Sequence, residues 1–202
     1  MIAVPRKGPI AAAELLAELG ADPDWLAMRA AKDRELAERR ARLRAEEQPL
    51  LDDLASLGIA VESAWQLNSS FDSYEAAIPV LLSHLERPYS PRLREGIARA
   101  LGSKAARPTA WAPLLAMVRS GALSGDVADG VMAAISAMAQ PADLGTLIAL
   151  IKNRSLGSPR LFLVGNLMRS KKPEARATLA QLEGDPDLHK EIAVRLKERS
   201  SR

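Results

Sequence analysis

The chain has 202 residues, of which 48% are hydrophobic and only 3% aromatic, and its formal net charge is +3. This length is enough for one compact domain or a short repeat array, and the scarcity of aromatic residues leaves Leu, Ala, Ile and Val to form a core typical of packed helices. The absence of cysteine and the presence of only two histidines exclude disulfides, thiolate catalysis and cysteine- or histidine-rich metal sites, and we expect no cofactor.

The N-terminal segment gives no sign of export or membrane insertion. Glu14 and Glu18 interrupt its apolar residues, and no clean cleavage site follows, so we expect no signal peptide. No apolar run reaches the roughly 18 residues that a membrane helix needs. The sequence therefore predicts a soluble cytoplasmic protein.

Residues 1–72 are predicted to form a charged helical leader that caps the rest of the chain. A short helix is expected over 9–19, and Asp22-Pro23-Asp24 predicts the start of a second helix, because Asp22 can cap free amides and Pro23 suits the first helical position. Residues 28–47 hold seven Arg or Lys and five Asp or Glu. This composition indicates a solvated helix, or alternatively an arm for dimerisation or docking.

Two features are expected to divide the end of the leader. Pro49 is predicted to break or kink the charged helix, and a short amphipathic helix over 50–57 should follow and end at Gly58. A further short helix is expected around Trp65. An Asn-Ser-Ser turn at 68–70 then predicts a joint.

From about residue 73 the chain shows a repeat. Ser90, Ser124 and Ser158 are spaced 34 residues apart, and a period in the thirties is typical of stacked helix pairs. Apolar residues at helical spacing predict four pairs, each with a helix A followed by a helix B: 73–86 and 90–102, 108–119 and 125–138, 141–152 and 159–169, and 173–182 and 186–198.

The segment from Ser90-Pro91-Arg92-Leu93-Arg94 to Ala100-Leu101-Gly102 resembles the second helix of a HEAT repeat, and Pro173-Glu174-Ala175 resembles the start of a first helix. The HEAT resemblance covers roughly residues 73–198, and the whole chain is similar to short bacterial HEAT-repeat proteins with a charged helical leader. The resemblance implies an all-α fold, a right-handed α-solenoid of about four HEAT-like hairpins, and protein binding without a catalytic residue. We therefore expect an armadillo-like helical repeat domain over 73–202.

The candidate binding residues are the outward positions of the B helices. A stacked scaffold would present them to an extended segment or a domain of a partner protein, as an adaptor or scaffold does, and a preformed surface lowers the ordering cost of association. Oligomerisation through residues 23–57 is an alternative use of the leader. These candidate residues are Arg92, Glu95, Arg99, Asp126, Asp129 and Arg169.

The basic residues leave DNA binding open as an alternative function. HEAT-like alkylpurine DNA glycosylases bind DNA in a concave basic groove, and Arg99 and Arg169 could point into such a groove. Interspersed acids and the scarcity of aromatics for base stacking favour protein binding instead.

Three other groups have structural interpretations. His84 is expected to be a partly buried structural histidine, because it lies beside the apolar stripe of its helix. Trp65 and Trp111 are expected in the core. The pairs Asp126/Asp129 and Asp185/Asp187 are interpreted as first-turn acids that favour a helix dipole.

Overall fold

The computed structural model describes residues 20–67 and 74–200, and within these ranges all regular secondary structure is helical, with no strand. The chain divides into two compact units, residues 1–46 and 47–202. Helix α2 (Pro23–Ser56) runs through this division and so contributes to both units. The expected helix over 9–19 and the turn at 68–70 lie outside the described residues, and the predicted start of the repeats after residue 72 stays a prediction.

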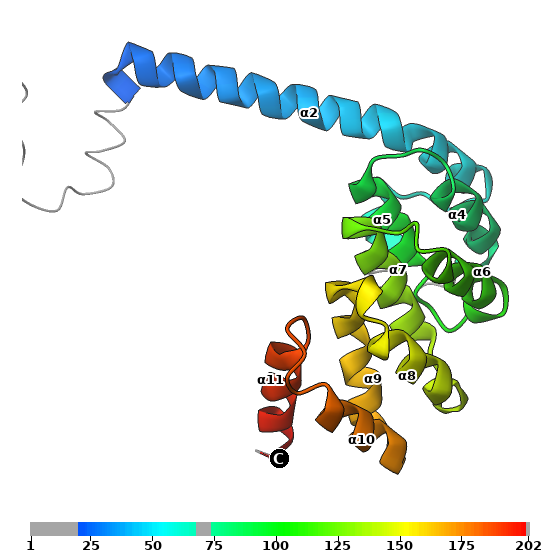
Figure 1. The fold of residues 1–202 in the computed structure, drawn as a ribbon. Helices are drawn as coiled ribbons and strands as arrows, with labels where there is room; N and C mark the ends of the chain where they lie inside the picture. The colour runs from blue at the N-terminus through cyan, green and yellow to red at the C-terminus, as the bar shows by residue number, and fades with distance from the viewer. Residues whose placement is uncertain (1–19, 68–73, 201–202) are drawn as a thin grey trace, which may run out of the picture. The chain divides into compact units, whose positions relative to one another are not determined.

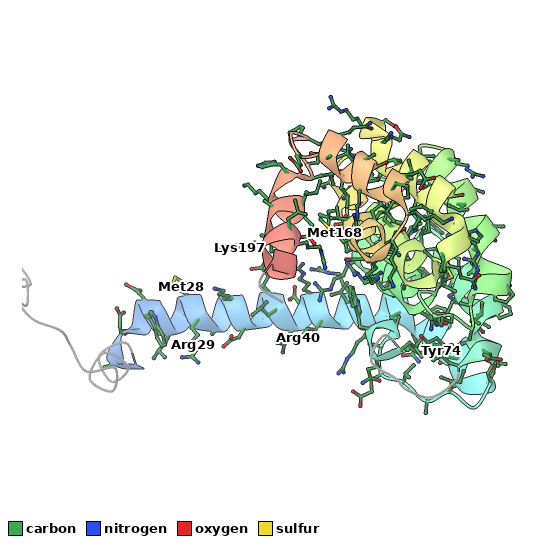
Figure 2. The ribbon with its side chains drawn as sticks, turned by 90° about the horizontal axis from the view of Figure 1, so that it is seen from below. Met28, Arg29, Arg40, Tyr74, Met168 and Lys197 are labelled. Carbon is green, nitrogen blue, oxygen red and sulfur yellow. The ribbon has the colours of Figure 1, made fainter. Side chains whose placement is uncertain are left out.

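The first unit consists of the charged part of α2. The Asp22 carboxylate accepts hydrogen bonds from the backbone N–H groups of Asp24 at 2.9 Å and Trp25 at 3.3 Å, so the predicted cap is confirmed. The helix surface is charged, and even Met28 is 64% exposed. Figure 2 shows the side chains of Met28, Arg29 and Arg40 projecting outward from this helix.

The prediction that Pro49 breaks the helix and that a separate helix follows over 50–57 is wrong, whereas the alternative of a kink at Pro49 stays a prediction. The helix continues through Pro49 to Ser56, although proline removes one backbone hydrogen bond and crowds the preceding turn. Leu50 and Leu54, which follow the proline on one face, are fully buried in the second unit. Their burial, at about 1.5–3 kcal/mol each, offsets the cost of the proline. The helix ends at Ser56, just before the expected stop at Gly58, whose φ is 77°.

The second unit arranges its helices in two layers (Figure 1). One layer holds α3 (Ala64–Leu67), α5 (Pro91–Ala100), α7 (Gly125–Met138), η4 (Ser158–Leu163) with α9 (Val164–Arg169), and α11 (His189–Ser200), which contact one another in this order. The other layer holds η1 (Glu75–Ala77) with α4 (Ile78–Leu85), α6 (Arg107–Arg119), η2 (Pro141–Asp143) with α8 (Leu144–Lys152), and α10 (Pro173–Gln181). A single turn, η3 (Arg154–Leu156), joins α8 to η4.

These bounds confirm the eight helices predicted from the repeat, although four of them differ at their starts. The third helix B opens as a 3-10 segment before α9, where Gly157 at φ of 63° and Pro159 set the chain direction. Helices A of the first and third pairs also open with 3-10 turns. The last helix begins at His189 rather than near 186, because Asp185 and Asp187 are engaged elsewhere.

The core lies between the two layers and is aliphatic. Leu81, Ile97, Leu114 and Ile135 are fully buried, as the helical spacing predicted. In α11, Ile192 is buried, whereas Leu196 is 38% exposed. Trp65 and Trp111, expected in the core, are half-buried at its edge.

Candidate partner-binding site

Helices α5 and α7 approach so closely that side chains are excluded between them. A Cβ atom on Gly130 would lie 2.8 Å from the backbone oxygen of Glu95, and one on Gly102 would lie 3.2 Å from the Cα of Ala134. The first distance is shorter than van der Waals contact and would force the two helices apart, so glycine is needed at position 130, while the second is a tight contact. The close packing brings Glu95 of α5 beside the Asp129 turn of α7.

Glu95 and Arg99 form an ion pair one helical turn apart. The Nε atom of Arg99 donates to Oε1 of Glu95 at 2.9 Å, and the two side chains are 30% and 17% exposed, respectively. The guanidinium of Arg99 also lies 5.3 Å from the centre of the Phe162 ring, at a distance that favours a cation–π contact. Two partners therefore hold Arg99 in place on the α5–α7 surface.

Asp129 is a half-buried carboxylate that no side chain neutralises directly. Among the described residues none forms a hydrogen bond or ion pair with it. Burial raises its pKa above the ordinary 3.8, the charge of Glu95 raises it further, and Arg99 opposes the shift. Asp129 is thus an acceptor left available to an incoming donor.

A pocket of about 470 Å³ opens beside this cluster. Its aromatic wall is formed by Trp65 and Tyr74, and the Tyr74 hydroxyl donates to the Ala100 carbonyl at 3.0 Å. Burial raises the pKa of Tyr74, so the phenol keeps its proton at neutral pH. The pocket is lined by Trp65, Tyr74, Glu95, Arg99, Gly102, Ala133 and Ala137.

The structure gathers most, but not all, of the predicted site residues. Arg92 is exposed and lies 5.9 Å from the Trp65 ring centre, at the edge of the same surface. Asp126 occupies the first turn of α7 as expected, whereas Asp129 lies one turn further on. Arg169, at the end of α9, lines a different pocket.

A buried polar network that the sequence interpretation missed connects η4 to the turn before α11. Arg160 is fully buried and forms a two-pronged ion pair with Asp185, with nitrogen–oxygen distances of 3.1 and 2.9 Å. It also donates to Asp187 at 2.6 Å. The interpretation of Asp185 and Asp187 as dipole acids is therefore wrong. The available signal was an arginine inside an apolar run, because a buried charge requires a partner.

His84 is structural, as predicted, and more deeply buried than expected, with no exposed surface. One ring nitrogen lies 2.9 Å from the Tyr89 hydroxyl and the other 2.8 Å from a carboxylate oxygen of Asp53. The second contact ties α4 to the end of α2 within the second unit.

Comparisons of the chain with protein-family models, with curated proteins and with solved structures find no match. Across the described ranges, no three side chains of the metal-binding types gather into one group. No helix in the same part of the chain is long and apolar enough to cross a membrane.

Proposed function

We propose that this chain is a non-enzymatic protein-binding module whose repeat helices form a right-handed, HEAT-like α-solenoid. The 34-residue spacing of Ser90, Ser124 and Ser158 and the two layers of alternating helices support this architecture (Figure 1). Repeat arrays of this kind offer extended surfaces for partners.

The observation that carries the proposal is the charge cluster of Glu95, Arg99 and Asp129. Arg99 is held by Glu95 and Phe162, while Asp129 has acceptor capacity that no described residue uses. A partner that places a lysine or arginine at Asp129 would recover the energy lost by burying that carboxylate.

The neighbouring aromatic pocket supplies the apolar part of such an interface. Trp65 and Tyr74 line it, and tryptophan, tyrosine and arginine are the residue types that most often dominate binding energy. Their positions are set by packing before any partner arrives. Association would therefore cost less side-chain ordering than on a flexible surface.

The test is affinity capture of the tagged protein from an extract of its own cells, with nuclease present, followed by mass spectrometry. We expect one stoichiometric protein partner, which a variant with Arg99→Glu and Asp129→Lys loses. A matched variant with Arg119→Glu and Glu183→Lys, which reverses one charge of each sign at exposed positions outside the cluster, should keep the partner. Capture of no protein by the parent chain would contradict the proposal.

One observation favours a second candidate, DNA binding of the kind seen in HEAT-like alkylpurine DNA glycosylases. The Glu95 carboxylate lines a pocket with Trp65 and Tyr74, and base-excision chemistry needs a carboxylate close to aromatic side chains. This candidate predicts DNA affinity that falls steeply as salt rises. Capture of nucleic acid alone, abolished by nuclease, would favour it over protein binding.

A further inference from the structure

A second pocket, of about 500 Å³, lies beside η2, α8 and the end of α9. Pro141, Leu144 and Leu147 give it an apolar lining. Its volume is within the range of about 300–1,000 Å³ that ligand-binding pockets show. It shares no lining residue with the α5–α7 pocket.

Three cationic side chains line this pocket: Arg169, Lys171 and Lys172. All three are exposed, and none forms an ion pair with another described residue. Asp143 lies between the lining residues Pro141 and Leu144, but its carboxylate is already paired with Arg107 at 2.9 Å. The three cations that line the pocket therefore have no ion-pair partner among the described residues.

The side-chain amide of Asn166, which also lines the pocket, is occupied within the protein. The Ser136 hydroxyl donates a hydrogen bond to Oδ1 of Asn166 at 2.6 Å. The Nδ2 group of Asn166 donates to the backbone carbonyl of Ser136 at 2.9 Å. No aromatic residue lines the pocket, so it offers no platform for a nucleic acid base. The remaining chemistry is an aliphatic surface beside three cations.

We propose that this pocket binds an acidic segment of a partner protein. An aliphatic side chain of the segment would pack on Leu144 and Leu147, while its carboxylates pair with Arg169, Lys171 and Lys172. The inference rests on the proposed protein-binding function and specifies that the segment bound at this pocket is acidic and carries an aliphatic side chain. Charge complementarity would orient the segment, and burial of its apolar side chain would hold it.

The test selects binders from a library of displayed short peptides against the full chain. We expect enrichment of sequences that combine acidic residues with Leu, Ile or Val. Synthetic versions should bind a variant with Arg169→Glu, Lys171→Glu and Lys172→Glu about tenfold more weakly or worse, because each reversal replaces attraction with repulsion.

A matched variant separates the pocket from the general effect of charge. Arg119→Glu, Lys152→Glu and Lys190→Glu reverse the same number of charges at exposed positions outside the pocket, and this variant should bind the peptides as the parent chain does. Equal weakening in both variants would overturn the pocket assignment. Far-UV circular dichroism should show both variants as folded as the parent chain.

Two outcomes distinguish failure of this inference from failure of the proposed function. Peptides that bind the pocket variant normally but fail on the Arg99→Glu, Asp129→Lys variant would overturn the pocket and leave protein binding at α5–α7 standing. Absence of any enriched peptide, while the parent chain still captures a stoichiometric protein partner, would overturn the pocket and leave protein binding standing; absence of both would overturn both. If a labelled single-stranded DNA oligonucleotide binds the parent chain but not the pocket variant, the acidic peptide is the wrong ligand and the pocket binds nucleic acid.

Discussion

Replacing Arg160 with methionine should destabilise the second unit strongly. Arg160 makes five hydrogen bonds: to the backbone carbonyls of Gly157 and Ile151, to both carboxylate oxygens of Asp185, and to Asp187. In Arg160→Met the Asp185 carboxylate stays buried, at 1% exposure, without its main counter-charge. Removing one partner of a buried pair costs about 3–5 kcal/mol, and we expect a loss of that size.

Urea unfolding followed by far-UV circular dichroism measures this loss. Arg154→Ala is the matched control, because Arg154 also reaches Asp185, at 3.4 Å, from a side chain that is 75% exposed. An exposed partner is worth about 0–1 kcal/mol, so this control should be nearly neutral. A loss below about 1 kcal/mol for Arg160→Met, or equal losses in the two variants, would refute the reasoning.

The same network makes a prediction about acid. Hydrogen bonding to Arg160 holds the pKa of Asp185 below its ordinary 3.8, so near that pH the unfolded chain binds more protons than the folded one. The stabilisation is therefore complete above the unfolded value and is lost as pH falls through the folded pKa. The stability difference between the parent chain and Arg160→Met should shrink over that window.

Three further tests use the same unfolding measurement, and the first two each compare a substitution with a control. Gly130→Ala should cost about 1–3 kcal/mol because its Cβ meets the α5 backbone, whereas Gly145→Ala, in open space within α8, should gain about 0.5–1 kcal/mol; the reverse order would contradict the close approach. His84→Ala should cost about 2–4 kcal/mol through a cavity and two lost hydrogen bonds, and Asp53→Asn clearly less, because Asp53 is half-exposed. Asp129→Asn should leave stability at neutral pH unchanged or slightly higher, since its raised pKa means that ionisation opposes folding above that pKa; a clear loss would show that the carboxylate has a stabilising partner.

The positions of the helices could be predicted from the sequence because local signals set them. The apolar stripes of α6 and α7 gave their bounds to within a residue, and Pro91 at the first turn of α5 marked its start. The close approach of the α5 backbone to Gly130 depends on packing between two helices, which local signals do not fix.

Part of the candidate site was also predictable. Glu95, Arg99 and Asp129 were selected as outward positions of the B helices, and the packing of α5 on α7 brings them together. The placement of Arg169 at a separate pocket was not predictable, because spacing along the chain does not fix which helix surfaces share a pocket.

Local signals in the sequence set the all-helical class, most of the helix boundaries and the aliphatic core, since capping, proline placement and a 3.6-residue period act over a few residues. Tertiary structure decided the rest. It carried α2 through Pro49 because Leu50 and Leu54 are buried beyond it. It also buried Arg160 against Asp185, 25 residues away, because a charge removed from water needs a partner that only the folded chain can bring to it.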